Sequence, residues 1–399
     1  MKRSVSVFGS TGSVGVNTVD LLTRQGGAEA YDVVALTGAT NVELLARQAR
    51  QLNAQFAVTA SDNHLETLRE LLSDHPCEVL NGAEGLCTVA QYETDWAMSA
   101  IVGAAGLAPT LELAKSTNTL GLANKESLVC AGELLLAACK DSGTTLLPVD
   151  SEHSAIFQSL QGENCSAIER IILTASGGPF RTWGVDKMAM ASLDDALAHP
   201  NWEMGQRITI DSASMFNKAL ELIEAQKLFS VRPDQVEVVV HPQSIIHSMV
   251  GFADGAIMAQ LGPADMRGPI GYALNFPDRL PLPLQRLDLG QLARLDFEPP
   301  DPLKFPSLRL AREVMEAGGA TGAVFNAAKE VALDGFLAGN CGFLDMAEIV
   351  EECLIRLGPA AAEISPADGI NAIFTVDKQA RDVGRTILAA TAANSQRAS

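Results

Sequence analysis

A glycine-rich loop between a strand pattern and a helix pattern, close to the start of the chain, limits this sequence to few folds. Residues 4–8 (SVSVF) have the apolar character of a buried strand, GSTGSVG follows at 9–15, and apolar residues then recur at helical spacing through Leu22. YDVVALTG at 31–38 is a second strand pattern. Strand, loop, helix and strand in this order predict a βαβ unit, which requires a parallel sheet.

Strand and helix patterns continue to alternate over about the first 150 residues. Further helices are predicted near 41–53 and 64–72, from Pro109 and from Ser127, and further strands at 56–60, 97–103, 118–124 and 144–150. The 33 glycines and only 5% aromatic residues suit an α/β protein with tight turns. We therefore predict an α/β fold whose residues 1–150 form a Rossmann-like, doubly wound parallel sheet.

The pattern changes after Asp150, where strand-like runs become more frequent. They lie at 168–176 and 236–242, and 248–261 has the pattern of a hairpin around Asp254 and Gly255. Two histidines in these apolar stretches, His241 and His247, are expected to satisfy buried backbone groups rather than to bind metal. We predict that 151–275 is a central α+β domain that carries the catalytic, metal-binding and substrate-binding residues.

The last third of the chain is divided by proline. Residues 276–305 are proline-rich with little periodicity, which predicts a linker. From Ser307 onward, four segments have apolar residues at helical spacing. We predict that 306–399 is a small C-terminal helical bundle.

Charge and cysteine content narrow the classes of partner. The 48 acidic and 29 basic residues give a net charge of −19, and the chain has no run of Lys and Arg, so we expect no nucleic-acid partner. A small phosphorylated ligand remains compatible with this charge, because a few local cations and backbone N–H groups can hold one phosphate.

Seven scattered cysteines without a C-x-x-C pair argue against a disulfide framework and a thiolate zinc site. No apolar stretch is long enough to span a bilayer, and a strand pattern starts within a few residues of Met1, so we expect no membrane partner and a cytoplasmic location.

The glycine loop suggests a nucleotide cofactor. Glycines at 9, 12 and 15 let the backbone approach a pyrophosphate at a helix N-terminus. The G-x-x-G-x-x-G spacing fits a dinucleotide site and also a plain tight turn. At the end of the second strand, residues 36–41 include no acid that would repel a ribose 2′-phosphate, which favours NADP over NAD.

Two carboxylates end the last strand of the predicted parallel sheet. Asp150 and Glu152 flank Ser151, and on an extended backbone they would point to the same side at the carboxyl edge of the sheet, where ligands bind. Closely spaced carboxylate oxygens suit Mg²⁺ or Mn²⁺. The same tripeptide suits a helix N-cap equally well, so both interpretations stay open.

The segment DSASMFNKALELIEA at 211–225 offers a third carboxylate. Ser212 is predicted to cap a helix on which Asn217 and Glu221 share one face, with Lys218 beside them. Glu221 would then be a metal ligand, while the hydroxyl, amide and ammonium groups would bind a phosphate near the helix start. The alternative is an ordinary capped surface helix.

Two further motifs have both a functional and a structural interpretation. TASGGPFR at 174–181 follows a strand, and Ser176 with two glycines forms either an anion-binding turn or a plain glycine-rich turn. HPNWEMG at 199–205 has no clear periodicity. It suits a lid that folds Trp202 over the substrate, or a loop with a structural surface tryptophan.

Eight motifs together resemble one family from end to end, the 1-deoxy-D-xylulose 5-phosphate reductoisomerases. They are GSTGSVG, ANKESLV (123–129), PVDSEH (148–153), ASGGPFR, HPNWEMG, DSASMFNKALELIEA, HPQSIIHSMV and LGPADMRGPI (261–270). The resemblance implies an NADPH domain, a central catalytic domain and a C-terminal bundle in a homodimer. It also implies NADPH- and metal-dependent rearrangement and reduction of 1-deoxy-D-xylulose 5-phosphate to 2-C-methyl-D-erythritol 4-phosphate, in the non-mevalonate route to isoprenoid precursors.

The resemblance also implies roles for individual residues. Ligands of Mg²⁺, Mn²⁺ or Co²⁺ would be Asp150, Glu152 and Glu221, and these with Lys125 and His199 would form the catalytic set. Substrate contacts would come from Lys125, Ser151, Glu152, Ser176, His199, Trp202, Ser212, Asn217, Lys218 and Glu221. NADPH contacts would come from Thr11, Gly12, Ser13, Val14, Ala39, Thr40, Asn41, Asn124, Glu126 and Gly205. The chain departs from the family pattern at Ala39 and Thr40, which affects the 2′-phosphate contacts.

Two other functions are compatible with parts of the same sequence. A simpler NADP-linked dehydrogenase of a small phosphorylated or amino-acid-derived carbonyl compound would share the N-terminal fold, but it would not need three carboxylates. A non-catalytic nucleotide-sensing module would bind NADPH without metal-dependent turnover. Metal dependence of turnover distinguishes the first function from both.

Overall fold

The computed structural model describes residues 2–200, 202 and 205–398, and the chain divides into two compact units. The first unit comprises Met1–Ser127, Leu134–Phe157 and Asp265–Gln285, and the second comprises Leu128–Glu133, Gln158–Ala264 and Arg286–Ser399. The predicted domain boundaries at 150, 275 and 305 stay predictions, since the two units are each built from several stretches of chain.

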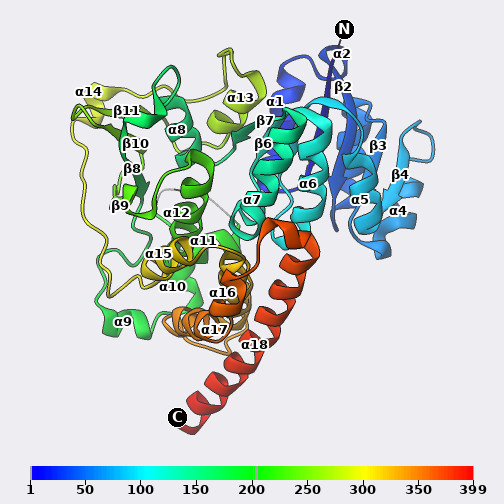
Figure 1. Ribbon diagram of the computed structural model, residues 1–399. Helices are drawn as coiled ribbons and strands as arrows, with labels where there is room; N and C mark the ends of the chain where they lie inside the picture. Colours follow the sequence, from blue (N-terminus) through cyan, green and yellow to red (C-terminus); the bar gives the residue numbers. More distant parts are fainter. Residues whose placement is uncertain (1, 201, 203–204, 399) are drawn as a thin grey trace. The chain divides into compact units, whose positions relative to one another are not determined.

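The first unit contains a seven-stranded sheet in the order β4-β3-β2-β1-β5-β6-β7, and every neighbouring pair is parallel (Figure 1). The strands are β1 (Arg3–Phe8), β2 (Tyr31–Gly38), β3 (Phe56–Thr59), β4 (Glu78–Asn81), β5 (Thr94–Ser99), β6 (Thr117–Leu122) and β7 (Thr145–Pro148). The strand order reverses between β1 and β5, which is where a doubly wound sheet binds its ligand. The predicted Rossmann-like sheet is therefore confirmed.

One predicted strand of this unit needs correction, and two of its elements were not predicted. The apolar run at 97–103 predicted a strand, but β5 begins at Thr94 and ends at Ser99, and Gly103 beyond it has φ +80°. The strand β4 and the helix α5 after it were not predicted. The β4 side chains are half-buried or exposed on this edge strand, so its residues lack a strong apolar pattern.

The helices of the first unit include one from much later in the chain. They are α1 (Ser13–Arg24), α2 (Gly27–Ala30), α3 (Val42–Leu52), α4 (Leu65–Leu71), α5 (Gly82–Ala90), α6 (Leu107–Ser116), α7 (Lys125–Ser142), α8 (Ser151–Ser159) and α13 (Arg267–Asn275). α13 buries Ile270 and Leu274 in the core of this unit, and the Ala273 carbonyl accepts a 3.0 Å hydrogen bond from the fully buried Trp96 indole. This helix thus completes the core of the N-terminal sheet.

The second unit contains a four-stranded mixed sheet in the order β11-β10-β8-β9, in which only the β8–β9 pair is parallel. Its strands are β8 (Ile168–Ala175), β9 (Val236–Val240), β10 (Ile246–Phe252) and β11 (Ile257–Leu261). The predicted hairpin is confirmed as β10 and β11, and Gly255 at φ +89° forms its turn. The central α+β prediction agrees with this sheet and with the helices that precede β9.

The helices of the second unit include α15 to α18, which form the predicted C-terminal helical region, and earlier helices that carry candidate site residues. They are α9 (Val185–Ala189), α10 (Leu193–Leu197), α11 (Gln206–Ala213), α12 (Phe216–Phe229), α14 (Leu289–Leu292), α15 (Ser307–Ala317), α16 (Thr321–Leu337), α17 (Asp345–Ala362) and α18 (Gly369–Ala398). α16 is buried along most of its length. An ion pair connects it to α18: Arg381 of α18 lies 2.7 Å from Glu330 of α16.

The two strand histidines have the structural role predicted for them. The Ile245 N–H donates to Nε2 of His241 at 3.2 Å, so Nδ1 carries the proton and donates to the Asp296 carbonyl at 2.8 Å. Nε2 of His247 lies 3.2 Å from the Pro263 carbonyl. The His241–Asp296 bond and a β-bridge between Val240 and Glu298 connect the predicted linker at 276–305 to the end of β9.

The seven cysteines are free, and four of them are buried thiols with raised pKa values. Burial raises the pKa to about 11 for Cys77, Cys139 and Cys353, and to about 12 for Cys341. Within the described residues, none of the helices combines the length and the apolar character needed to cross a bilayer.

Candidate active site

The glycine loop follows β1 at the reversal point of the parallel sheet, and two of its glycines are required by the fold. Gly9 has φ +87°, and a Cβ there would lie 2.5 Å from the Ala100 carbonyl oxygen. A Cβ on Gly15 would lie 2.1 Å from the Gly9 carbonyl oxygen. Side chains at these two positions would force backbone atoms apart.

Gly12 is different, because the fold alone does not demand a glycine there. It is the exposed N-cap of α1 with φ −80°, and a Cβ would meet only the Gly9 carbonyl oxygen, at 3.4 Å. The absence of a side chain does, however, leave the N-terminus of α1 open to a close-approaching anion. The loop therefore fits the pyrophosphate of a dinucleotide.

The end of β2 lies beside this loop and holds it in place. The Gly9 N–H donates to the Thr37 hydroxyl at 2.9 Å, and a Cβ on Gly38 would lie 3.0 Å from Oγ1 of Thr11. Exposed positions follow directly at Ala39, Thr40 and Asn41, and Asn41 caps α3 by accepting from the Leu44 N–H at 3.1 Å. The predicted cofactor residues at 11–14 and 39–41 thus adjoin one another.

Asn124 and Glu126 are buried, and Asn124 holds the start of α7. The Asn124 amide donates to the Ile101 carbonyl at 2.7 Å and to the Glu126 carboxylate at 2.7 Å, and its oxygen accepts from the Ser127 N–H at 3.0 Å. The helix begins at Lys125, two residues before the predicted start. The Asn124 side chain is thus engaged within the protein, and its predicted contact with NADPH stays a prediction.

Asp150 caps a helix and also forms an ion pair with Lys125. Its Oδ1 accepts from the Glu152 and His153 N–H groups at 3.1 and 3.3 Å, while Oδ2 accepts from the Lys125 ammonium. Burial alone would raise the pKa of Asp150, but the charges of Lys125 and His153 hold it well below the usual range. The N-cap interpretation is confirmed, and the expected extended backbone is wrong because α8 starts at Ser151.

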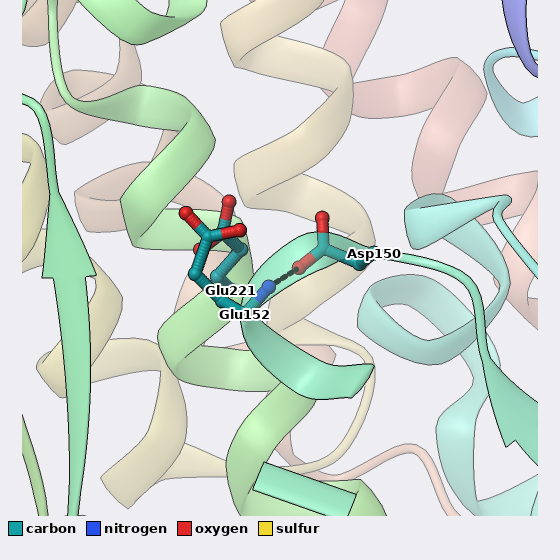
Figure 2. A group of neighbouring side chains, drawn as sticks. All are labelled: Asp150, Glu152 and Glu221. Atoms are coloured by element: carbon teal, nitrogen blue, oxygen red, sulfur yellow. Dashed lines mark hydrogen bonds between the residues drawn. The ribbon is translucent and has the colours of Figure 1, made fainter. Parts of the chain in front are cut away.

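Three carboxylates gather around this cap. One carboxylate oxygen from each of Asp150, Glu152 and Glu221 lies within 4.8 Å of the others (Figure 2). Such a group of negative charges repels itself unless cations offset it, and carboxylate oxygens at this spacing suit a hard divalent cation. The donor set therefore fits the predicted Mg²⁺ or Mn²⁺.

Glu221 is oriented by its own helix. It is 0% exposed on α12, where it accepts from the Asn217 amide at 2.5 Å and from the Lys218 ammonium at 2.5 Å. The predicted shared face of Asn217 and Glu221 is confirmed. The Lys218 charge, with that of Lys125 on Asp150, offsets two of the three negative charges.

Ser212 does not have the predicted capping role. It lies in the last turn of α11, and α12 begins only at Phe216, after Met215 adopts the left-handed conformation with φ +60°. The sequence signal was misleading because a serine before a helix pattern is also found at the end of a preceding helix. Ser212 is half-buried as a residue.

The Ser176 turn packs against this end of α11. Gly178 has φ +62°, and a Cβ on it would lie 3.2 Å from the Ser212 carbonyl oxygen. The Gly178 N–H donates to Oγ of Ser176 at 3.2 Å. The structure thus brings together two of the hydroxyl residues predicted to bind substrate, from segments about 35 residues apart in the sequence.

His199 connects the Ser176 turn to the predicted lid. The Trp202 N–H donates to Nδ1 of His199 at 2.9 Å, so this nitrogen is unprotonated, and Nε2–H faces Oγ of Ser176 at 3.1 Å. Burial lowers the pKa of His199, in agreement with a neutral ring. Gly205 is the exposed N-cap of α11. Residues 201, 203 and 204 of the lid segment lie outside the described residues.

Sequence reasoning missed two charged groups near these residues. Asp211 of α11 and Lys329 of α16 are buried and pair at 2.9 Å. The available signal was Lys329, one of two adjacent charged residues in the mainly small and apolar segment GAVFNAAKEVAL, where a buried charge requires a partner. His153, at the end of the PVDSEH motif, is fully buried with Nδ1 at 3.0 Å from Oδ1 of Asp150.

Comparisons with known proteins agree over the whole chain. Residues 5–132 match the family model for 1-deoxy-D-xylulose 5-phosphate reductoisomerase, and 146–229 and 261–383 match models for C-terminal domains of the same enzyme. The 1-deoxy-D-xylulose 5-phosphate reductoisomerases of Jannaschia sp. and Rhizobium etli are each 56% identical to this chain. The alignments cover 97% and 95% of this chain, and 98% and 95% of the relatives.

Solved structures give the same result. The Zymomonas mobilis enzyme in complex with NADPH is 45% identical with a TM-score of 0.90, over 97% of this chain and 99% of that one. A DOX-P reductoisomerase in complex with NADPH, fosmidomycin and magnesium is 39% identical with a TM-score of 0.92, over 97% and 98%. With the motifs, the fold and the carboxylate cluster, these matches establish that the chain belongs to the 1-deoxy-D-xylulose 5-phosphate reductoisomerase family.

Proposed function

We propose that this chain catalyses the NADPH- and divalent-metal-dependent conversion of 1-deoxy-D-xylulose 5-phosphate to 2-C-methyl-D-erythritol 4-phosphate, in the non-mevalonate route to isoprenoid precursors. The observation that carries the proposal is the cluster of Asp150, Glu152 and Glu221 in a chain that matches the family along its length. A simple NADP-linked dehydrogenase does not need three such carboxylates. The family match also favours the reductoisomerase over that alternative.

Asp150, Glu152 and Glu221 would hold Mg²⁺ or Mn²⁺, with Co²⁺ also compatible with the oxygen ligands. When bound, the metal polarises the substrate's ketone and adjacent hydroxyl and so promotes the carbon shift, and NADPH supplies the hydride for the reduction. The capping bonds of Asp150 and the Asn217 and Lys218 bonds of Glu221 hold the carboxylates in place beforehand. Preorganisation of this kind lowers the cost of assembling the charged site.

The nicotinamide cofactor would bind along the glycine loop, with its pyrophosphate at the N-terminus of α1 near Gly12 and Ser13. The ribose with its 2′-phosphate would lie against 39–41. Backbone N–H groups, the hydroxyl of Thr40 and the side-chain amide of Asn41 are the donors there, and neither Ala39 nor Thr40 brings a positive charge. We therefore expect a weaker preference for NADPH over NADH than an arginine or lysine at this position would give.

The substrate phosphate would be bound by hydroxyl, amide and ammonium donors of the second unit, namely Ser176, Ser212, Asn217 and Lys218. An ammonium has three N–H donors, so Lys218 can keep its bond to Glu221 and still donate to a phosphate oxygen. Ser151 would add a substrate contact beside Glu152.

Lys125 and His199 would act next to the reacting carbons. The ammonium of Lys125 would stabilise a developing oxyanion while it neutralises Asp150. Neutral His199 would hold the Trp202 backbone and so set where the lid segment begins to close over the substrate and exclude water.

The decisive experiment follows the absorbance of NADPH with 1-deoxy-D-xylulose 5-phosphate and Mn²⁺, beside Asp150→Asn and Glu221→Gln variants, an EDTA-treated sample and an NADH control. We expect metal-dependent turnover that collapses in both variants but persists in Glu352→Gln, which alters an exposed carboxylate of α17. Turnover that survives EDTA would instead favour the dehydrogenase.

A homodimer is also part of the proposal, with β11 as its contact. This strand lies at the edge of the mixed sheet, and most of its side chains, including Ile257 and Met258, are exposed. An exposed apolar edge strand is a liability in a monomer, whereas a two-fold axis would pair it antiparallel with its copy. The free cysteines support a reducing compartment, and we propose the cytoplasm.

A further inference from the structure

Two ion pairs connect α11 with α16 in the second unit, and they differ in burial. Oδ2 of Asp211 lies 2.9 Å from Nζ of Lys329, and these side chains are 9% and 5% exposed. One turn earlier on α11, Nη1 of Arg207 lies 2.5 Å from Oδ1 of Asp334, with side chains 45% and 60% exposed. The same two helices thus carry a buried pair and a surface pair.

The buried pair is costly to maintain for stability alone. Removing two charges from water carries a large desolvation penalty, and apolar residues of similar volume often stabilise a fold as well or better. α16 already packs through apolar side chains on this side, since Phe325 contacts Phe216 of α12 with ring centroids 5.7 Å apart. A charged hydrogen bond is directional, so the Asp211–Lys329 pair can fix the position of Asp211, and with it the end of α11, more closely than apolar packing does.

Asp211 immediately precedes Ser212 at the end of α11. The Ser212 carbonyl forms the surface against which Gly178 of the Ser176 turn packs, so close that a Cβ on Gly178 would lie 3.2 Å from it. A small shift of α11 along its axis would therefore move Ser212 relative to Ser176. Lys329 holds α11 at the residue next to this contact.

We propose that Asp211 and Lys329 are a positioning pair for substrate binding, which fixes the end of α11 so that Ser212 and Ser176 present their hydroxyls to the same phosphate group. The inference rests on the proposed function, in which these two serines bind the substrate phosphate. Neither member of the pair touches the substrate. Lys329 acts through Asp211, and Asp211 acts through the backbone of Ser212.

The test compares Asp211→Asn and Lys329→Met with Asp334→Ala, which removes the surface pair between the same helices. We expect KM for 1-deoxy-D-xylulose 5-phosphate to rise at least about tenfold in the first two variants, because misplacement by a fraction of an ångström weakens several donors at once. KM for NADPH should stay at the wild-type value, since the cofactor loop is in the first unit. Asp334→Ala should leave both constants unchanged.

A second readout does not depend on turnover. Inorganic phosphate, titrated calorimetrically into the protein, should bind the wild type and bind Asp211→Asn at least about tenfold more weakly. Lys329→Arg keeps the charge and should restore part of the affinity, which also provides a folded variant if Lys329→Met does not fold. Circular dichroism establishes that each variant tested is folded.

The outcomes separate the two proposals. Folded Asp211→Asn and Lys329→Arg proteins with wild-type phosphate affinity and wild-type KM would overturn the positioning role. Equal increases in both KM values would also overturn it, because they would indicate general loosening of the fold. A wild-type protein that binds phosphate but turns nothing over would contradict the proposed function, while the phosphate titrations would still decide on the pair.

Discussion

At the scale of single residues, two glycines of the loop have different roles: Gly15 is needed for the fold, and Gly12, as we propose, for cofactor binding. Gly15→Ala places a Cβ 2.1 Å from a backbone oxygen, so we expect it to lower the free energy of unfolding by about 3 kcal/mol or more. Gly12→Ala meets only a 3.4 Å contact and should leave the melting temperature near that of the wild type, while KM for NADPH rises about tenfold. Thermal unfolding and steady-state kinetics on both variants test this contrast. Equal loss of stability in the two would contradict it.

His199 gives a pH-dependent prediction. Burial lowers its folded-state pKa below the unfolded value of about 6.5, so the unfolded chain takes up the proton first as the pH falls. As the pH falls below about 6.5, His199 therefore lowers the free energy of unfolding, and this decrease stops once the pH passes its folded-state pKa. Protonation of Nδ1 would also break the 2.9 Å bond from the Trp202 N–H.

Nuclear magnetic resonance of the histidine ring protons measures this directly. The signal that disappears in His199→Gln identifies the residue, and we expect its titration midpoint to lie below about 6.5. A midpoint above that value would contradict the lowered pKa, and a midpoint above neutral pH would mean that the ring is mostly charged there and that Nδ1 does not accept from Trp202.

At the scale of elements, α16 organises the second unit through close approach as well as through charge. A Cβ on Gly322 would lie 2.0 Å from the Val129 carbonyl oxygen of α7, whereas a Cβ on Gly358 of α17 would meet nothing within 4 Å. We expect Gly322→Ala to lower the free energy of unfolding by about 2 kcal/mol or more. Gly358→Ala should change it by less than about 1 kcal/mol, since helix propensity favours alanine while the following Pro359 disfavours a Cβ at this helical position. Chemical denaturation of both variants provides the measurement, and a stable Gly322→Ala protein would show that the two helices can separate at little cost.

At the scale of the whole molecule, the exposed edge strand predicts the assembly. Light scattering coupled to gel filtration should give the mass of a dimer for the wild type. Met258→Glu puts a charge on β11, where the side chain is 47% exposed, and should shift the protein toward the monomer because an unpaired charge would have to be buried in the contact. Met190→Glu is the control, since Met190 is 84% exposed and lies away from that strand in the sequence. If Met258→Glu leaves the dimer intact, the interface does not include β11.

Much of the fold was predictable because its signals are local. The alternation of apolar strands with helix patterns predicts a parallel sheet, and Gly255 with Asp254 predicts the β10–β11 hairpin. The errors have local causes too. β4 lacks an apolar pattern because it is an edge strand, and the apolar run beyond Ser99 continues past the end of β5.

The candidate site was predictable in its residue types more than in its backbone. Asp150 was expected as either a helix cap or a cluster member, and it is both, because a carboxylate has enough acceptor positions for two N–H groups and further partners. Ser212 was expected to begin a helix and instead lies at the end of one. Asp211 and Lys329 went unnoticed because the sequence does not show which charged residues 118 positions apart will be buried together.

The sequence by itself determined the parallel sheet, the glycine loop at its reversal point and the chemical character of the candidate ligands. These depend on side-chain periodicity, on glycine's missing Cβ and on oxygen chemistry, all of which act over a few residues. Only the tertiary structure decided that Glu221 lies beside Asp150 and Glu152, that α13 returns to the core of the N-terminal sheet and that Lys329 reaches Asp211. The reason is that such contacts join distant parts of the chain, and packing of the whole core selects among the many pairings that local patterns allow.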